Sequence, residues 1–429
     1  MENSLTQLST WPKILRFALP AIAENALQTL MGFVDVWLVA RVSLAAVSGV
    51  SLANGVMAVY LALFVALGAI ISGRLAGQSN LTFIASSLKL TALISVILGL
   101  LTAIFAHPFL QLLGAHSGVL KGATLYLTWI GGLVFVLALM TILGGILRAK
   151  GDTKTPMFIT FGANILNILI SGTLILMLHW GVAGAITGTL IARFLACVLL
   201  VLKLYSRGFA PTLGQIIHVP LDAQLFKQSL PAMGERLAMR AGDLIVMALI
   251  ITFSPSIFAG NAIGETLTSF NYAPLFGLAS ITVILVGQQL KQNNPKAIKR
   301  DVHITYWLSS FATLAIGAIV WGLSSFLNPL FTTNAIAQQA STLVIIIVFA
   351  SSFLFAGTVT YTAAFQGLGK AQLPFIATLI GMFVVRIGGG FFLGHTLNLQ
   401  LLGVQLAIVL DNVWRFGFLA FRFRKEVQW

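Results

Sequence analysis

The sequence predicts an all-α integral membrane protein with twelve transmembrane helices in two parallel six-helix repeats. Of its 429 residues, 58% are hydrophobic and only 8% are charged, whereas soluble globular domains are about one quarter charged. Twelve apolar stretches are long enough to cross a bilayer core, which needs about 20 helical residues. Short motifs also recur about half a chain apart, which indicates an internal duplication.

The predicted spans fall into two sets separated by a linker. The first set covers residues 12–40, 44–73, 84–106, 122–147, 155–179 and 181–204. The second set covers residues 223–252, 257–290, 301–326, 338–366, 372–396 and 400–421. The stretch between them is rich in Gly and Pro, which are typical of loops. The predicted domains are an N-lobe at 1–204, a linker at 205–222 and a C-lobe at 223–429.

The distribution of Lys and Arg predicts the orientation in the membrane. These residues concentrate in alternate loops, for example Arg148, Lys150 and Lys154, whereas the opposite loops hold only Arg41 and Lys121. The positive-inside rule therefore places both termini in the cytoplasm. The same bias explains the net charge of +14 without a nucleic-acid partner, because basic loops contact anionic lipid headgroups.

The two halves match at several places in the same order. Residues 19–24 (LPAIAE) recur as residues 230–235 (LPAMGE), and residues 147–156 align with residues 365–374. Each half has an even number of spans, so both start from the same side of the membrane. The repeats are therefore parallel, and such folds usually hold substrate between their halves.

More than half of the acidic residues lie inside predicted membrane spans, where a charged side chain costs the most free energy. Six of the eleven lie inside predicted spans, where an ionisable side chain usually marks an ion or substrate path. On the first helix Glu24 and Asp35 face nearly the same way, about 16 Å apart along the axis. Either carboxyl could exchange a proton or bind a cation. The alternatives are a structural cap or pair for Glu24 and an interfacial pair with Arg41 for Asp35.

Other charged and polar residues form pairs at helical spacing. Arg240 with Asp243 and Asp411 with Arg415 are predicted to form structural ion pairs within their helices. In the eighth span a stripe of three polar residues shares one face, which either packs through hydrogen bonds or lines a polar cavity. The stripe comprises Asn261, Glu265 and Thr268.

The fifth span has no acid but carries Asn164 and Asn167, whose amides either join helices or serve a site. Met31 belongs to a set of methionines that either pack or form an adaptable binding wall. The single cysteine, Cys197, allows no disulfide within the chain and suggests no metal cluster. No nucleotide-binding or hydrolase motif occurs, so we expect a transporter driven by an ion gradient and not an enzyme.

These motifs together resemble the MATE (multidrug and toxic compound extrusion) transporters. The resemblance rests on Pro20, Glu24 and Asp35 in the first helix, on the loop at 147–156, and on Pro231 with Glu235. It implies two six-helix lobes that form a V around a central cavity. It also implies that a drug or metabolite leaves in exchange for H+ or Na+.

The resemblance also assigns roles to individual residues. Asp35 matches the aspartate that binds the coupling cation, H+ or Na+, and Asn164 and Asn167 look like the asparagines that assist it. Pro20 matches a proline at which the first helix bends, and Glu235 resembles a glutamate of many bacterial members. We expect Glu24 to contribute to cation coupling. The predicted substrate cavity comprises Glu235, Glu265, Asn261, Asn271 and Met31.

The sequence thus predicts a monomeric exporter of amphipathic, cationic small molecules in the bacterial inner membrane, with no cofactor beyond its coupling ion. One alternative is a lipid-linked oligosaccharide flippase of the same superfamily, because a pyrophosphate headgroup needs positive charge within the spans. Five arginines could supply that charge: Arg193, Arg236, Arg240, Arg386 and Arg415. An intramembrane enzyme is a further alternative, but it would need acids or histidines clustered at one membrane face.

Overall fold

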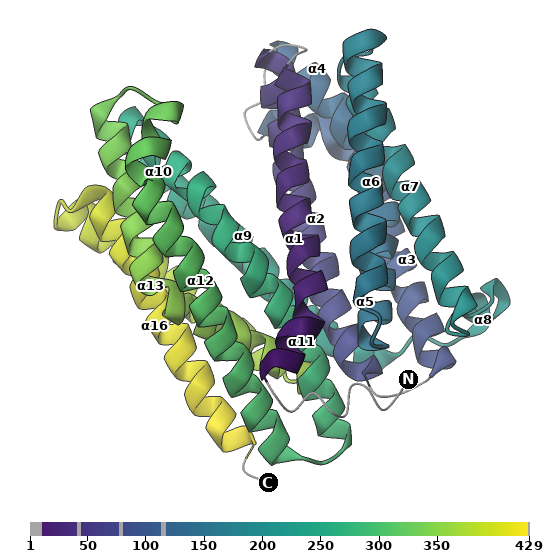
Figure 1. The fold of residues 1–429 in the computed structure, drawn as a ribbon. Helices are drawn as coiled ribbons and strands as arrows, with labels where there is room; N and C mark the ends of the chain where they lie inside the picture. Colours follow the sequence, from purple (N-terminus) through teal and green to yellow (C-terminus); the bar gives the residue numbers. More distant parts are fainter. Residues whose placement is uncertain (1–10, 41–43, 77–79, 113–116, 428–429) are drawn as a thin grey trace. The chain divides into compact units, whose positions relative to one another are not determined.

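The computed structural model describes residues 11–40, 44–76, 80–112 and 117–427, and all regular elements in these ranges are helical. The first half contains α1 (Trp11–Ala40), α2 (Leu44–Leu75), α3 (Leu81–Leu112), α4 (Ser117–Tyr126), α5 (Val134–Ala149), α6 (Lys154–Gly172), α7 (Val182–Ser206) and the short α8 (Leu213–His218). The second half contains α9 (Ala223–Ile251), α10 (Pro255–Thr268), α11 (Tyr272–Lys291), α12 (Pro295–Phe331), α13 (Ala335–Gly367), α14 (Gln372–Leu379), α15 (Gly389–Phe391) and α16 (Gln400–Glu426). Figure 1 shows the helices as ribbons.

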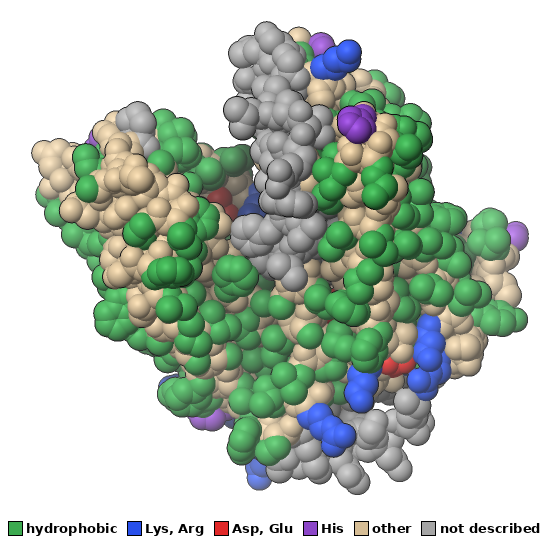
Figure 2. Space-filling view, turned by 45° about the horizontal axis from the view of Figure 1, so that its top comes forward, with side chains coloured by type: hydrophobic (Ala, Val, Ile, Leu, Met, Phe, Trp, Pro, Cys, Tyr) green, Lys and Arg blue, Asp and Glu red, His purple; other side chains and the backbone are tan. Residues whose placement is uncertain are grey.

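Helix occupies each of the twelve predicted spans, which confirms the predicted fold class of an all-helical membrane protein. Nine helices among the described residues are long and apolar enough to cross a membrane, and a tenth span results if the bent α4–α5 pair is counted. Hydrophobic side chains cover much of the face shown in Figure 2, as expected for a surface whose solvent is lipid.

Four predicted spans depart from a regular α-helix. Within residues 155–179, α6 passes into a π-helical turn, η3 (Thr173–Met177). Residues 122–147 contain a 47° bend between α4 and α5, with a π-helical turn, η2 (Leu127–Gly131), before it. Here α3 approaches closely, since a Cβ on Gly99 would lie 2.4 Å from the carbonyl oxygen of Gly132. A 3₁₀ turn, η4 (Ser269–Asn271), separates α10 from α11. The span at 372–396 includes a long π-helical stretch, η5 (Ile380–Gly388), and a shorter one, η6 (Phe392–Thr396).

The helices pack into two compact units. Unit 1 combines residues up to Asn25 with residues 230–429, and unit 2 comprises residues 26–229. The start of α1 therefore packs with the second half of the chain. Gly277 of α11 permits this packing, because a Cβ there would lie 2.7 Å from the side chain of Ile22. The lobes at 1–204 and 223–429, with their linker at 205–222, stay a prediction.

In unit 2, α6 and α7 meet at a glycine contact. A Cβ on Gly188 would lie 2.1 Å from the Ser171 hydroxyl oxygen and 2.8 Å from the Ser171 backbone nitrogen. Because the second atom is backbone, the two helices must separate if the residue gains a side chain. Close approach of this kind is how small residues hold membrane helices together.

We expect Gly188→Ala to destabilise the protein by about 1–3 kcal/mol, the usual cost of overpacking. The matched control is Gly162→Ala on α6, where an added Cβ meets no atom within 4 Å. The measurement is the melting temperature of both variants in the same detergent. Equal melting temperatures for the two variants would show that α6 and α7 do not touch at Gly188.

The segment before α9 is fixed to unit 2 by Asp222. Its Oδ1 accepts a hydrogen bond from the Leu225 N–H at 2.8 Å, which caps α9, and its Oδ2 pairs with Arg74 at 2.9 Å. Burial raises the pKa of Asp222, but the Leu225 N–H and the Arg74 guanidinium outweigh it, so the pKa lies below its ordinary value. The stabilisation therefore exists above the unfolded pKa of about 3.9 and is lost as pH falls through the folded pKa.

The pH dependence of one variant tests this contact. Because Asn can still cap a helix, Asp222→Asn removes mainly the ion pair with Arg74. We expect it to cost about 0.5–1 kcal/mol at pH 7, the upper part of the range for solvent-accessible pairs. Melting temperatures of wild type and variant should converge as the pH is lowered toward the folded pKa. A difference that stays constant with pH would exclude the carboxylate as its cause.

Candidate functional site

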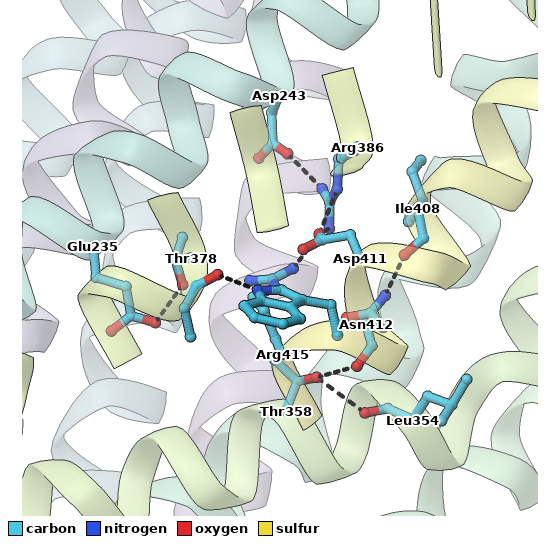
Figure 3. A network of polar contacts seen from close by, with 12 residues as sticks. Glu235, Asp243, Leu354, Thr358, Thr378, Arg386, Ile408, Asp411, Asn412 and Arg415 are labelled. Atoms are coloured by element: carbon cyan, nitrogen blue, oxygen red, sulfur yellow. Dashed lines mark hydrogen bonds and ion pairs between the residues drawn. The ribbon is translucent and has the colours of Figure 1, made fainter. Parts of the chain in front are cut away.

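A buried ionic network joins three elements of unit 1 (Figure 3). Arg386 of η5 donates from Nε to Asp411 Oδ2 of α16 at 2.8 Å, and from Nη1 to Asp243 Oδ1 of α9 at 3.2 Å. Arg415, one turn after Asp411, contacts the same Oδ2 at 2.7 Å. Two arginines and two aspartates thus balance in charge, which is what low-dielectric burial requires.

Asp411 is the centre of this network. Its side chain is fully buried and one oxygen serves both arginines. The other oxygen, Oδ1, has no hydrogen-bond partner and lies against Gly381 of η5, where a Cβ would be 2.1 Å away. The absence of a side chain at residue 381 therefore lets η5 approach α16 closely enough for Arg386 to reach Asp411.

Glu235 lies beside this network with few partners. It is buried in α9, and its Oε1 accepts a long 3.5 Å contact from the Thr378 hydroxyl, while Oε2 has no hydrogen-bond partner at normal distance. A buried carboxylate without such partners is costly. Taking up a proton or a cation would remove that cost, which is the chemistry that an ion-coupled protein needs.

The three residues of the polar stripe on α10 differ in their burial and contacts. Asn261 is buried, donates to Glu265 Oε1 at 3.0 Å and accepts from Gln405 Nε2 of α16 at 2.9 Å. Thr268 bonds back to its own helix at the Gly264 carbonyl. Glu265 itself is exposed. An exposed carboxylate in a membrane-spanning helix does not face lipid cheaply, and the predicted cavity beside Glu265 stays a prediction.

In unit 2, the two asparagines of α6 contact neighbouring helices. Asn164 Nδ2 donates to the Leu27 carbonyl of α1 at 3.3 Å, and Asn167 Nδ2 donates to the Thr189 hydroxyl of α7 at 3.0 Å. Asn167 Oδ1 accepts from Ser171. The predicted coupling residue Asp35 and the predicted cavity residue Met31 are in α1, but their side chains lie outside the described part of the structure.

Comparison with known proteins decides the family. The sequence profile of the MatE family matches residues 20–173 and 231–392, once in each half of the chain. The chain belongs to the MatE family. This confirms the resemblance read from the motifs, and it makes the protein a MATE transporter rather than an enzyme.

Individual relatives agree over nearly the whole chain. The probable multidrug resistance protein NorM of Thermotoga maritima is 26% identical over 417 residues, which span 94% of this chain and 90% of that protein. The uncharacterized transporter YisQ of Bacillus subtilis is 26% identical over 94% of this chain and 91% of its own. A MATE crystal structure in the bent conformation has a TM-score of 0.89 at 20% identity, covering 99% of this chain and 97% of that one.

The fold of this MATE transporter sorts its predicted site residues between the two units. Glu24, Glu235, Asn261, Glu265 and Asn271 belong to unit 1, and Asn164 and Asn167 belong to unit 2. Pro20 is buried within α1, and the helix continues through it. Asn271 is buried in η4 with neither amide atom hydrogen-bonded. Whether these residues form a cation site and a substrate cavity remains a prediction.

The tertiary contacts of Arg386 were not predicted. The sequence marked it only as one of five arginines inside spans, because Asp243 and Asp411 lie 143 and 25 residues away in the chain. Helical spacing does not connect these residues. The available signal was charge balance, since an arginine this deep in a span needs an acidic partner.

Proposed function

We propose that this MATE transporter is a secondary active exporter of amphipathic, cationic compounds, which it exchanges for H+ or Na+. The observation that carries the proposal is the exposure of a carboxylate on a membrane-spanning helix of unit 1, that of Glu265 in α10. A charged carboxylate is stable at such a position only where water or a cationic ligand contacts it. The name of the Thermotoga relative, a probable multidrug resistance protein, agrees with this substrate class.

The coupling ion is assigned to Asp35, assisted by Asn164 and Asn167. Both amides lie on α6, where Asn164 contacts α1, and amide oxygens are suitable ligands for a monovalent cation. Ion and substrate would favour different access states, because an exchange cycle requires each ligand to bind the two states with different affinity. Glu24 and Glu235 supply further acids, and Pro20 supplies a hinge in α1.

We infer a bacterial inner membrane as the location of the protein, and the concentration of Lys and Arg in alternate loops favours a cytoplasmic position for both termini. The flippase alternative requires arginines that are free to bind a pyrophosphate. Arg386 and Arg415 are instead paired with Asp411, and Arg386 also with Asp243. The geometry of unit 1 therefore favours a cationic substrate over an anionic lipid headgroup.

Reconstituted vesicles provide the test. Purified protein in liposomes is loaded with a fluorescent lipophilic cation, and H+ and Na+ gradients are imposed separately. We expect dye movement to depend on one of the two gradients and to stop when that gradient is collapsed by its ionophore. Dye movement that ignores both gradients would contradict secondary active transport. Movement of a fluorescent lipid-linked pyrophosphate alone would support the flippase instead.

A further inference from the structure

The segment between α7 and α9 exposes large apolar side chains at regular spacing. Leu213 is 77% exposed and Ile217 is 64% exposed. Because they are four residues apart in α8, they lie on one face of that helix. Leu221 follows, also exposed. His218 and Gln215 lie on the other side of the helix, so α8 is amphipathic.

The segment is held in place by specific bonds, so its apolar face has a fixed direction. Lys89 of α3 donates from Nζ to the carbonyls of Ile217 and Val219 at 2.7 and 2.8 Å, which satisfies the end of α8. Thr212 and Gln215 form a capping box at its start. The Asp222 N–H donates to the Ser86 hydroxyl at 3.0 Å.

The exposed face continues the lipid-facing surface of α7. That helix ends seven residues before α8, and its outer side carries exposed apolar residues at helical spacing: Phe194, Val198, Leu202 and Tyr205. Tyr205 is the residue type expected where the apolar core meets the headgroups. Along the right-hand edge of Figure 2, where α7 and α8 lie in Figure 1, hydrophobic side chains continue to the tip of α8.

Positive charge borders this surface. Lys203 and Arg207 follow from the last turn of α7, and Arg207 also holds Asp152 at 3.3 Å. Lys150 lies 4.8 Å from the ring centre of Phe209. An apolar face flanked by basic residues, directly after a membrane-spanning helix, matches the interfacial zone of an anionic bilayer.

We propose that residues 205–222 form an interfacial strap, in which α8 lies in the membrane surface and inserts Leu213 and Ile217 among anionic lipids. The bonds from Lys89, Ser86 and Arg74 fix this strap to unit 2. The strap thus ties the connection between the two repeats to the bilayer. This inference stands apart from the proposed function, because it needs neither a substrate nor a coupling ion.

Depth-dependent quenching tests the strap. In a Cys197→Ala background, Leu213→Cys, Ile217→Cys and His218→Cys are each labelled with an environment-sensitive fluorophore. The protein is reconstituted into liposomes that contain nitroxide lipids near the headgroups, with neutral or anionic phospholipid. We expect quenching at residues 213 and 217 to exceed that at the control residue 218 by roughly twofold or more, as for a half-inserted helix.

The lipid comparison separates the two parts of the proposal. Quenching at residues 213 and 217 should be stronger with anionic than with neutral lipid, and high salt should reduce the difference because it screens charge. Equal, weak quenching at all three residues would overturn the strap and place α8 in water. Strong quenching that ignores lipid charge would overturn the anionic preference. All three sites are exposed, so labelling does not require the core to rearrange.

Discussion

Asp411→Leu is expected to lower the stability of the protein by about 3–5 kcal/mol, the usual cost of breaking a buried ion pair. Asp411 is completely buried and holds both Arg386 and Arg415 through one oxygen. Without it, Arg386 keeps its contact with the partly exposed Asp243, while the buried guanidinium of Arg415 loses the ion pair that it makes with Asp411. The measurement is the melting temperature in detergent, together with the yield of monodisperse protein.

Charge balance provides the control for this prediction. In the double variant Asp411→Leu with Arg415→Met, Arg386 still pairs with Asp243, so the cluster is neutral again. We expect the double variant to recover a substantial part of the lost stability, because replacing a complete buried pair by apolar residues is often neutral or favourable. If the double variant is as unstable as the two single variants added together, the residues do not act as one network.

The helices were predictable because apolar length is a local property of the sequence. Each of the twelve predicted spans is helical, and the prediction from Asp411 and Arg415 at i,i+4 is confirmed by a 2.7 Å contact. The prediction from Arg240 and Asp243 at i,i+3 holds only as a weak 3.9 Å pair, with both side chains largely exposed. Asp243 makes its shorter contact with Arg386.

What the sequence could not provide were contacts between distant elements. Gln405 reaches Asn261 across 144 residues, and no helical periodicity relates the two. The stripe on α10 left packing and cavity lining as equal alternatives. In the structure the residues of the stripe differ, since Asn261 is buried in helix packing and Glu265 is exposed. The breaks at η2 and η5 were also not predicted. Each lies beside a close approach at a glycine, Gly99 against Gly132 and Gly381 against Asp411.

Asp35→Asn is expected to reduce gradient-driven export by at least about tenfold while leaving folding intact. The coupling ion drives export only if it binds the two access states with different affinity, and the carboxyl that binds the ion supplies that difference. Coupling free energies are typically about 1–3 kcal/mol. Asparagine has nearly the same shape, so packing is preserved, but it cannot carry the charge or the proton. Export is measured in vesicles as the dye flux that disappears when the gradient is collapsed.

Glu24→Gln, eleven residues earlier in α1, is the matched comparison for Asp35→Asn. Glu24 is buried in unit 1 and Asp35 belongs to the part of α1 in unit 2, so the two variants separate the acids of the two units. We expect Glu24→Gln to lower export less than Asp35→Asn does, because Asp35 has Val246 at its matching place in the second repeat, whereas Glu24 is matched by Glu235. Each repeat therefore carries a glutamate at this place, whereas Asp35 occurs in the first repeat only. Wild-type export by Asp35→Asn, with loss of export by Glu24→Gln, would move the coupling site to the duplicated glutamates.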